Sequence, residues 1–403
     1  MISFAALILS VLLLQLSSGA VAPLDALSGL SLGFTTAQIG WLGSAHFVGF
    51  FVGCWWAPRL MGSVGHSRAF AVFTAMGAIG LLAHMLVIDP RAWIIMRVAS
   101  GLCVAGCYTV IEAWLQAKLT NETRGRAMGL YRSADLGASL AAQLLIGVLE
   151  PASYISYNLL AIICCAAILP LALTTQSPPK VTKAPRLRPR LAIQSSPLAG
   201  AAVIVAALSS ASFRMVGPVY GDVVGLTADQ IAWFLAAFVL GGAFAQWPAG
   251  WLADRYDRRW VLIGMSVAAM GSCALTVSLQ ATGTTGVMIA AAIFGLTTFP
   301  IYSVAAAHAH DFAKSEERVE LSAALMFFYA LGAIAAPATA SLLIDAYGPG
   351  ALFAMLAVGH GVLVIFGVAR MAARPTSEKR TRYIYAPRTS FSIGRLLSKE
   401  REK

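Results

Sequence analysis

The sequence predicts an all-α polytopic membrane protein with twelve transmembrane helices, arranged as two parallel six-helix pseudo-repeats. Three observations predict this fold. The chain of 403 residues is 58% hydrophobic and only 12% charged, whereas about a quarter of the residues of a soluble domain are charged. Its apolar residues fall in blocks of about 20, the length of a helix that spans a bilayer core of roughly 30 Å. The two halves of the chain also resemble each other.

Twelve apolar blocks follow one another along the chain. Gly and Pro inside a block do not argue against a transmembrane helix, because membrane helices tolerate both. A transmembrane barrel would instead show alternating segments of about ten residues. The first block is long and has no basic segment before it, so we expect an uncleaved helix rather than a signal peptide. The predicted helices are 3–24, 37–57, 68–88, 92–117, 126–148, 153–175, 197–219, 228–250, 259–280, 284–308, 319–343 and 349–371.

The basic residues are distributed unequally between the two sides of the membrane. All but four of the 29 Lys and Arg residues lie in loops on the side that holds both termini. The exceptions are Arg91, in a loop on the other side, and Arg97, Arg132 and Arg214 within helices. This asymmetry predicts that both termini are cytoplasmic. The net charge of +11 therefore reflects topology and contact with anionic lipid headgroups, and we expect no nucleic-acid partner.

A basic segment rich in Pro and Ser separates the two halves and predicts an extended cytoplasmic linker. The expected domains are an N-terminal bundle (1–175), this linker (176–196), a C-terminal bundle (197–371) and a basic cytoplasmic tail (372–403).

The repeat is visible in short matching stretches. TTAQIGWLG (residues 35–43) resembles TADQIAWFL (residues 227–235) at an offset of 192 residues, and the same offset pairs Gly49 with Gly241. Because each half contains an even number of helices, both halves start on the same side and the repeat is parallel. Two such halves are the plan of one large class of membrane transporters.

One loop resembles a known family. GWLADRYDRR, between the eighth and ninth blocks, is similar to the signature cytoplasmic loop of the major facilitator superfamily, which has a Gly, an Asp four residues later and a basic cluster. The resemblance implies a gate in which the Asp meets a helix end while the Arg residues hold carboxylates. An ordinary positive-inside loop is the alternative. The gate residues are Gly250, Asp254, Arg255, Arg258 and Arg259.

The resemblance extends over nearly the whole chain and implies the major facilitator fold. RVASG (residues 97–101) is similar to the family's Arg-x-x-x-Gly in helix 4, and IEAWL and TNETRGRAMGLYR resemble the YcaD-like branch of bacterial carriers. Two positions depart from the loop pattern: Asp257 stands where the family often has Gly, and the first-half copy has Gly62 in place of its Asp. The fifth block contains no Pro, unlike the family's proton-coupled drug antiporters, which disfavours that function.

Two charged residues in the fourth and fifth blocks are expected at similar depths. At 100° per residue, Glu112 shares a polar stripe with Arg97 and Tyr108. An unpaired charge inside a membrane helix costs about 3 kcal/mol or more, so we expect Glu112 to pair with Arg132, for which Asp135 is a second partner. Two interpretations stay open: an ion pair that only braces the helices, or a Glu112 that titrates as cargo moves.

The side chains of Arg97 and Arg214 are expected to reach a central cavity from the half of the membrane opposite the two termini. Two cations there favour an anionic or carboxylate-bearing cargo, because Arg binds carboxylates in a bidentate manner. The alternative is that each bonds backbone carbonyls or extends toward the lipid surface.

Two histidines end the tenth block. His308 and His310 point to different sides of the helix and cannot ligate one metal ion; we expect neither a metal nor a cofactor. His310 occupies the repeat position of Glu112, and the spacing of His308 and Asp311 allows a hydrogen bond, so a pH-sensitive latch is one interpretation. A capped, solvated helix end is the other.

Together these features predict a secondary active transporter that moves a small organic solute across the bacterial inner membrane by alternating access. We expect a monomer that is not an enzyme, with proton coupling as a finer expectation. The alternatives are a membrane sensor or scaffold on the same fold and a drug/proton efflux antiporter. The candidates for substrate binding or proton coupling are Arg97, Tyr108, Glu112, Arg132, Asp135, Arg214, His308 and His310.

Overall fold

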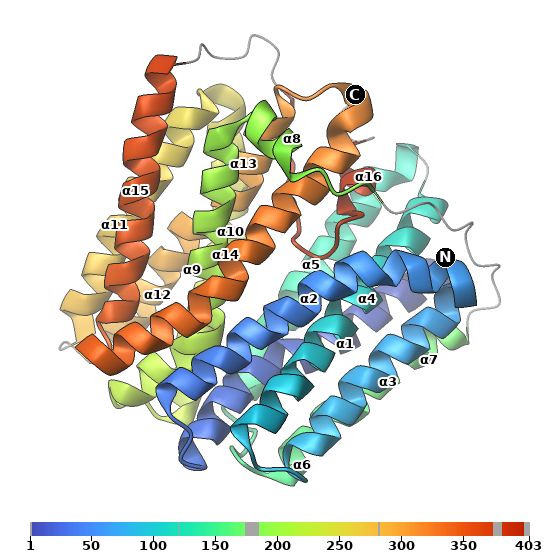
Figure 1. Ribbon diagram of the computed structural model, residues 1–403, viewed down its shortest axis with the longest axis vertical. Helices are drawn as coiled ribbons and strands as arrows, with labels where there is room; N and C mark the ends of the chain where they lie inside the picture. Colours follow the sequence, from blue (N-terminus) through green and yellow to red (C-terminus); the bar gives the residue numbers. More distant parts are fainter. Residues whose placement is uncertain (1, 120, 174–184, 281–282, 374–380, 399–403) are drawn as a thin grey trace.

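The computed structural model describes residues 2–119, 121–173, 185–280, 283–373 and 381–398, and every regular element among them is helical (Figure 1). The N-terminal half contains α1 (Ile2–Ser31), α2 (Thr36–Val64), α3 (His66–His84), α4 (Pro90–Lys118), α5 (Asn121–Leu145), α6 (Tyr154–Ala166) and α7 (Ile168–Ala172). The linker contributes α8 (Pro189–Ser195). The C-terminal half contains α9 (Pro197–Val223), α10 (Ala228–Arg255), α11 (Arg258–Leu279), α12 (Thr284–Thr298), α13 (Ile301–His310), the short η2 (Ser315–Glu317), α14 (Arg318–Tyr347) and α15 (Ala351–Ala373). The described chain ends with α16 (Ile393–Ser398).

Each predicted block overlaps one of these helices or a pair of them, and the all-helical prediction is confirmed. Two blocks are broken: 153–175 becomes α6 and α7, and 284–308 becomes α12 and α13. Pro170 and Pro300 explain the breaks, because proline lacks an amide hydrogen and its ring clashes with the carbonyl four residues earlier. Within the linker, where the sequence predicted extended chain, α8 packs against α9 and α14.

Ten stretches of the described residues are long and apolar enough, by length and composition, to cross a membrane. The remaining two predicted spans lie in α2, which is rich in Gly and Trp, and in α5, which contains Arg126, Arg132 and Asp135. With 29 and 25 residues, both are long enough to span a bilayer core at a rise of 1.5 Å per residue. The lower hydropathy of α5 reflects the polar groups that it brings to the interior.

The two halves repeat the same local structure where the sequence repeats. Thr35 caps α2 and exchanges two hydrogen bonds with Gln38, at 2.8 and 3.2 Å. Thr227 and Gln230 form the same reciprocal cap at the start of α10, at 3.0 and 3.3 Å. Such a box satisfies two backbone amides that the first turn would otherwise leave unpaired, so the repeated motif sets equivalent starting points for the two helices.

Glycines let equivalent helix pairs approach closely. A Cβ atom on Gly49 of α2 would lie 2.0 Å from the Val98 carbonyl oxygen of α4, and one on Gly241 of α10 would lie 1.9 Å from the Ala292 oxygen of α12. Small residues allow such crossings in membrane proteins, where van der Waals packing holds helices together. The pairing of α2 with α4 therefore has its counterpart in α10 with α12.

The two halves are in contact at one end and diverge at the other. We call the end with the turns at residues 32–35 and 225–227 the far side, and the end with the loop at residues 255–257 the tail side. In Figure 1 the halves meet at the lower left, where α2 and α14 lie side by side, and separate toward the upper right. At the contact, the Ser44 hydroxyl accepts a hydrogen bond from the Ala338 amide at 3.2 Å. A Cβ on Gly40 would lie 2.8 Å from the Pro337 oxygen, so the far side is closed.

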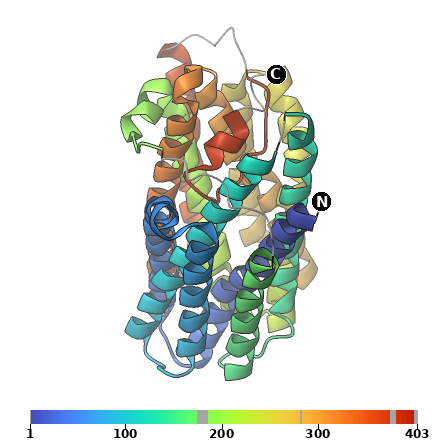
Figure 2. The same ribbon diagram turned by 90° about the vertical axis from the view of Figure 1, so that its right-hand side faces the viewer.

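The end of the chain fills the space on the tail side. Residues 381–398, which the sequence assigned to a basic cytoplasmic tail, lie between the two halves (Figures 1 and 2), and α16 packs against α4 and α14. Five apolar side chains of this segment are buried: Ile384, Ala386, Phe391, Ile393 and Leu396. Burying these side chains removes apolar surface from water and therefore favours docking of the tail between the halves. The positive charge of the segment did not indicate this burial.

Candidate functional site

A cavity of about 170 Å³ lies between the two halves. Helices α1, α2, α4 and α5 line it from one half, α9, α14 and Phe299 from the other, and tail residues close it on one side. Its polar and ionisable lining groups are Gln15, Ser18, His46, Tyr108, Asp135, Ser139, Gln143, Ser210, Arg214, Tyr329, Tyr385, Arg388 and Thr389. Polar groups that converge on one cavity are typical of sites that orient a small molecule.

Asp135 is held in this cavity by Tyr108. The Tyr108 hydroxyl hydrogen-bonds to the Asp135 carboxylate and lies 2.8 Å from Oε1 of Gln15. The contact joins α4 to α5 and includes α1, so it fixes a carboxylate at the junction of three helices. Of the sequence-predicted candidates, the structure thus brings Tyr108, Asp135 and Arg214 to one cavity.

Glu112 of α4 is hydrogen-bonded by residues of the tail. It is 1% exposed, and the hydroxyls of Thr389 and Ser390 donate hydrogen bonds to its two oxygens. The Tyr131 hydroxyl is 3.4 Å from the same carboxylate. The expected ion pair with Arg132 is replaced by these hydroxyl bonds, because the tail lies against Glu112. Arg132 itself has its guanidinium carbon 5.5 Å from the ring centroid of Tyr385.

Arg97 belongs to a separate buried cluster that the sequence did not reveal. Its Nε lies 3.4 Å from Oδ2 of Asp25, and His84 Nε2 lies 3.5 Å from the same oxygen. The Tyr157 hydroxyl donates to the other Asp25 oxygen at 2.8 Å. Arg97 is therefore drawn away from Arg214, which faces the central cavity. The prediction ended the first helix at residue 24, whereas α1 continues to Ser31 through Pro23 and includes Asp25.

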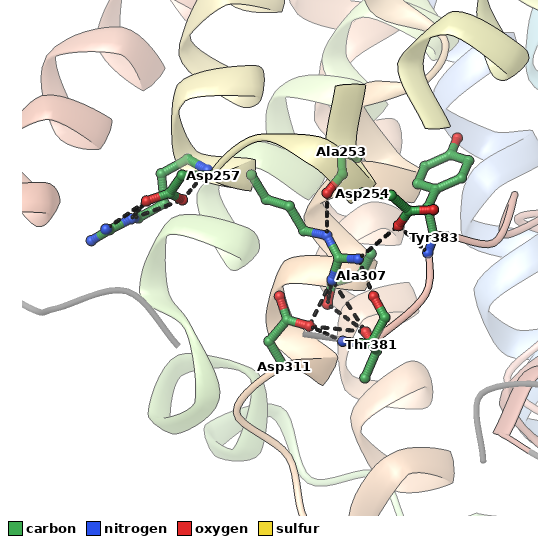
Figure 3. A network of polar contacts seen from close by, with 9 residues as sticks. Ala253, Asp254, Asp257, Ala307, Asp311, Thr381 and Tyr383 are labelled. Carbon is green, nitrogen blue, oxygen red and sulfur yellow. Dashed lines mark hydrogen bonds and ion pairs between the residues drawn. The ribbon is translucent and has the colours of Figure 1, made fainter. Parts of the chain in front are cut away.

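The signature loop forms a network on the tail side (Figure 3). Arg258 is 2% exposed, and its Nη1 lies 2.6 Å from Asp311 and 3.0 Å from the Ala307 carbonyl oxygen. Its Nη2 is 3.3 Å from Asp254, whose same oxygen accepts the Tyr383 amide at 2.7 Å. The network therefore connects the α10–α11 loop, the end of α13 and the tail.

The other loop residues have local roles. Asp257 caps α11 by accepting the Arg259 amide at 3.0 Å and pairs with the Arg259 side chain at 2.7 Å. In Figure 3, Asp257 lies apart from Asp254 and Asp311. The Arg255 guanidinium lies 5.5 Å from the centre of the Trp251 ring. At Gly250, an added Cβ would lie 2.7 Å from the Tyr383 ring, so this glycine makes room for the tail.

Burial raises the pKa of two side chains at this end of the molecule, Asp311 and Tyr383. Burial raises the pKa of Asp311, and the neighbouring Arg258 guanidinium opposes that rise. Burial likewise raises the pKa of Tyr383, which keeps its hydroxyl neutral, and this hydroxyl donates to Oε1 of Gln246 at 2.9 Å. Both groups thus act in the contact between the tail and the C-terminal half.

The two histidines at the end of α13 are buried, with 6% of His308 and 4% of His310 exposed. Nε2 of His310 lies 3.1 Å from the Ser322 hydroxyl of α14, and His308 packs edge-on against Phe312. Asp311 is engaged by Arg258 and Thr381. The described helix end is therefore packed rather than solvated. Within the described residues, no cluster of His, Cys, Asp and Glu could hold a metal ion.

Known proteins are similar to this chain over most of its length. A model described as Major Facilitator Superfamily matches residues 6–200 and again 199–401. An uncharacterized MFS-type transporter of Yersinia pestis (strain Pestoides F) is 28% identical over 351 residues, which cover 86% of this chain and 89% of that protein. The uncharacterized MFS-type transporter YcaD of Escherichia fergusonii is 27% identical over 348 residues, which cover 85% and 90%.

Solved structures share the fold. The nucleoside transporter NupG superposes with a TM-score of 0.71 at 14% identity, covering 92% of this chain and 98% of that one. A bacterial homologue of the human lysosomal transporter Spinster, in an inward-facing and unoccupied conformation, gives 0.67 at 15% identity, covering 99% and 96%. A D-xylose-proton symporter gives 0.68 at 12% identity, covering 93% and 98%. At these identities the likeness is one of fold.

Proposed function

Because this chain belongs to the major facilitator superfamily, we propose that it moves a small polar organic solute across the bacterial inner membrane by alternating access. The observation that carries the proposal is the cavity between the two halves, which both halves line with polar side chains. One chain supplies both halves that line the cavity, which supports a transporter that works as a monomer. Membership of a family of transport proteins also agrees with a protein that is not an enzyme.

The charge asymmetry of the loops supports an orientation in which the tail side faces the cytoplasm. With the far side closed by α2 and α14, the halves diverge toward the cytoplasm in this orientation, and the tail fills the space between them. The network of Asp254, Arg258 and Asp311 lies at that end. We assign it the role of holding the α10–α11 loop against the end of α13 in this conformation.

Two carboxyl groups, the buried Glu112 and the half-buried Asp135, support proton coupling. Glu112 and Asp135 receive hydrogen bonds from hydroxyl groups of Thr389, Ser390 and Tyr108. Ionisable groups in membrane helices are expensive in charged form and often serve in proton relays. A carboxyl group that exchanges hydroxyl partners as the tail or the cargo moves is suited to take up or release a proton.

Of the two arginines expected to favour an anionic cargo, only Arg214 lines the cavity, where the tail adds Arg388. Asp25 is the partner of Arg97, so only Arg214 of the two guanidiniums lines the central cavity, together with Asp135. Arg214 would meet a carboxylate of the cargo, while Asp135 would disfavour a second negative charge. With charges of both signs in the lining, we favour a polar cargo over one that is anionic throughout.

The test is a ligand-stabilisation screen on purified protein, followed by flux in proteoliposomes with and without a pH gradient. A stabilising solute should show saturable flux, which Asp135→Asn should reduce at least tenfold and Glu112→Gln should uncouple from the pH gradient. Glu150→Gln, in an exposed loop, is the matched control and should behave as wild type. Binding without flux would instead identify a sensor or scaffold, and flux of drugs outward against a proton gradient would identify an efflux antiporter.

A further inference from the structure

The tail places one guanidinium inside an aromatic cage at the edge of the cavity. The guanidinium carbon of Arg388 lies 5.0 Å from the ring centroid of Phe299, 5.9 Å from that of Tyr302 and 5.3 Å from that of Tyr329. A cation within about 6 Å of a ring centroid is attracted by the negative face of the ring. Three rings around one cation form the kind of site that recognises guanidinium and ammonium groups.

The cage is built by the C-terminal bundle and not by the tail. Phe299 follows α12, Tyr302 lies in α13, and Tyr329 lies in α14. The three residues are 3%, 3% and 5% exposed, and the rings of Tyr302 and Tyr329 pack edge to face at 5.6 Å. The helix break at Pro300 separates Phe299 from Tyr302, so the three rings come from three helical segments. A cage with this support can persist when the tail leaves.

Arg388 fills the cage but does not satisfy its own hydrogen bonds. Among the described contacts, its buried Nη1 atom has no hydrogen-bond partner. Asp135 and Arg214 line the same cavity, and the Arg214 guanidinium carbon lies 5.9 Å from the centre of the Phe299 ring. A buried donor without a partner is unfavourable, so a mobile ligand that places its donors better can compete with this side chain.

We propose that the cage of Phe299, Tyr302 and Tyr329 is a subsite for a guanidinium or ammonium group of a soluble organic cation, which Arg388 occupies in this conformation. The inference deepens the proposed function, on which it rests for the view that the cavity takes cargo. A cargo with a cationic group in the cage would have to displace the tail. It would then break the tail's hydrogen bonds to Glu112 and those of Thr381 and Tyr383 to the α10–α11 region.

The experiment removes the Arg388 side chain from the full-length protein and measures whether a free probe molecule binds in its place. Arg388→Ala empties the cage, and n-propylguanidinium has the head group and much of the stem of the missing side chain. By calorimetric titration of purified protein, the variant should bind n-propylguanidinium about tenfold more tightly than n-propylurea, its uncharged analogue of similar shape. Wild type, in which Arg388 competes, should bind the guanidinium at least tenfold more weakly than the variant.

Two second-site changes make the test specific for the cage. In the Arg388→Ala background, Tyr329→Phe keeps the ring and should keep the preference for guanidinium, whereas Tyr329→Leu should abolish it. Melting temperatures of both double variants report whether each is folded. Equal binding of the guanidinium and the urea, equal binding by wild type and Arg388→Ala, or a preference that survives Tyr329→Leu would each overturn the proposal.

The outcomes separate this inference from the proposed function. Guanidinium-selective binding in a protein that moves no solute would retain the subsite and reject the transporter. Saturable flux without any guanidinium preference would retain the transporter and reject the subsite.

Discussion

Asp25 and Arg97 form a buried pair in which each residue compensates the charge of the other in an apolar interior. Both are nearly inaccessible, at 2% and 1% exposed, and lie within 3.4 Å of each other. Tyr157 and His84 complete the surroundings of the Asp25 carboxylate. Removing one partner of a buried pair leaves an uncompensated charge, and that cost exceeds the benefit that the pair itself provides.

We therefore expect Asp25→Asn to destabilise the protein by about 3–5 kcal/mol, although the substitution keeps the shape of the side chain. The measurement is the unfolding midpoint in detergent, with the exposed Asp345→Asn as the matched control. Combining Asp25→Leu with Arg97→Met should restore part of the loss, because it removes both charges together. If Asp25→Asn melts with the control, the pair does not stabilise the fold.

At the scale of helices, glycines decide which pairs can cross closely. Gly49 and Gly241 occupy equivalent places in α2 and α10, and each faces a carbonyl oxygen of its neighbouring helix. The distances of 2.0 and 1.9 Å from an added Cβ to that oxygen leave no room for a methyl group. Because the obstacle is backbone, relief requires the helices to separate.

Gly49→Ala and Gly241→Ala should each cost about 1–3 kcal/mol or more through overpacking, and should lower the yield of folded protein in detergent. Gly271→Ala in α11 is the control, since nothing lies within 4 Å of its added Cβ and alanine favours helix over glycine by about 1 kcal/mol. Thermal melts compare the three variants. Similar melting of Gly49→Ala, Gly241→Ala and Gly271→Ala would show that the helix pairs have room to spare.

The whole molecule has one closed end and one end filled by its own chain. The far side is sealed where Ser44 and Ala338 meet, with the Ser44 hydroxyl 3.2 Å from the Ala338 amide nitrogen. Alternating access requires this contact to open in another conformation. A covalent bond across it would hold the two halves in the arrangement seen here.

Oxidation of a Ser44→Cys, Ala338→Cys double variant should therefore reduce flux to near background, and a reductant should restore it. Each single cysteine variant serves as the control and should be insensitive to the oxidant. Full flux in the cross-linked protein would contradict the view that the far side must open. The same cross-link should leave probe binding from the tail side intact.

Short-range sequence patterns were sufficient to predict the helices and the parallel repeat, and the repeated stretches contain the helix caps that the structure shows. Hydrophobic length defines a membrane helix whatever lies beside it, and the boxes at Thr35 and Thr227 form between residues three apart. The family resemblance also pointed to Asp254 and Arg258, which flank the loop on the tail side at the end of α10 and the start of α11; their role in a gate stays a prediction. The breaks in blocks 153–175 and 284–308 were not predicted, because the effect of Pro170 and Pro300 depends on whether neighbouring helices re-satisfy the freed backbone groups.

Only the tertiary structure decided which groups meet. Glu112 is bonded to residues 277 and 278 positions away in the chain, and Arg388 reaches a cage whose rings come from three helical segments. The charge of the segment predicted a basic cytoplasmic tail, but five of its apolar side chains are buried between the halves. Which residues come into contact depends on the angles at which helices cross and on how far the two bundles diverge. The hydrophobic periodicity of a single helix encodes neither quantity.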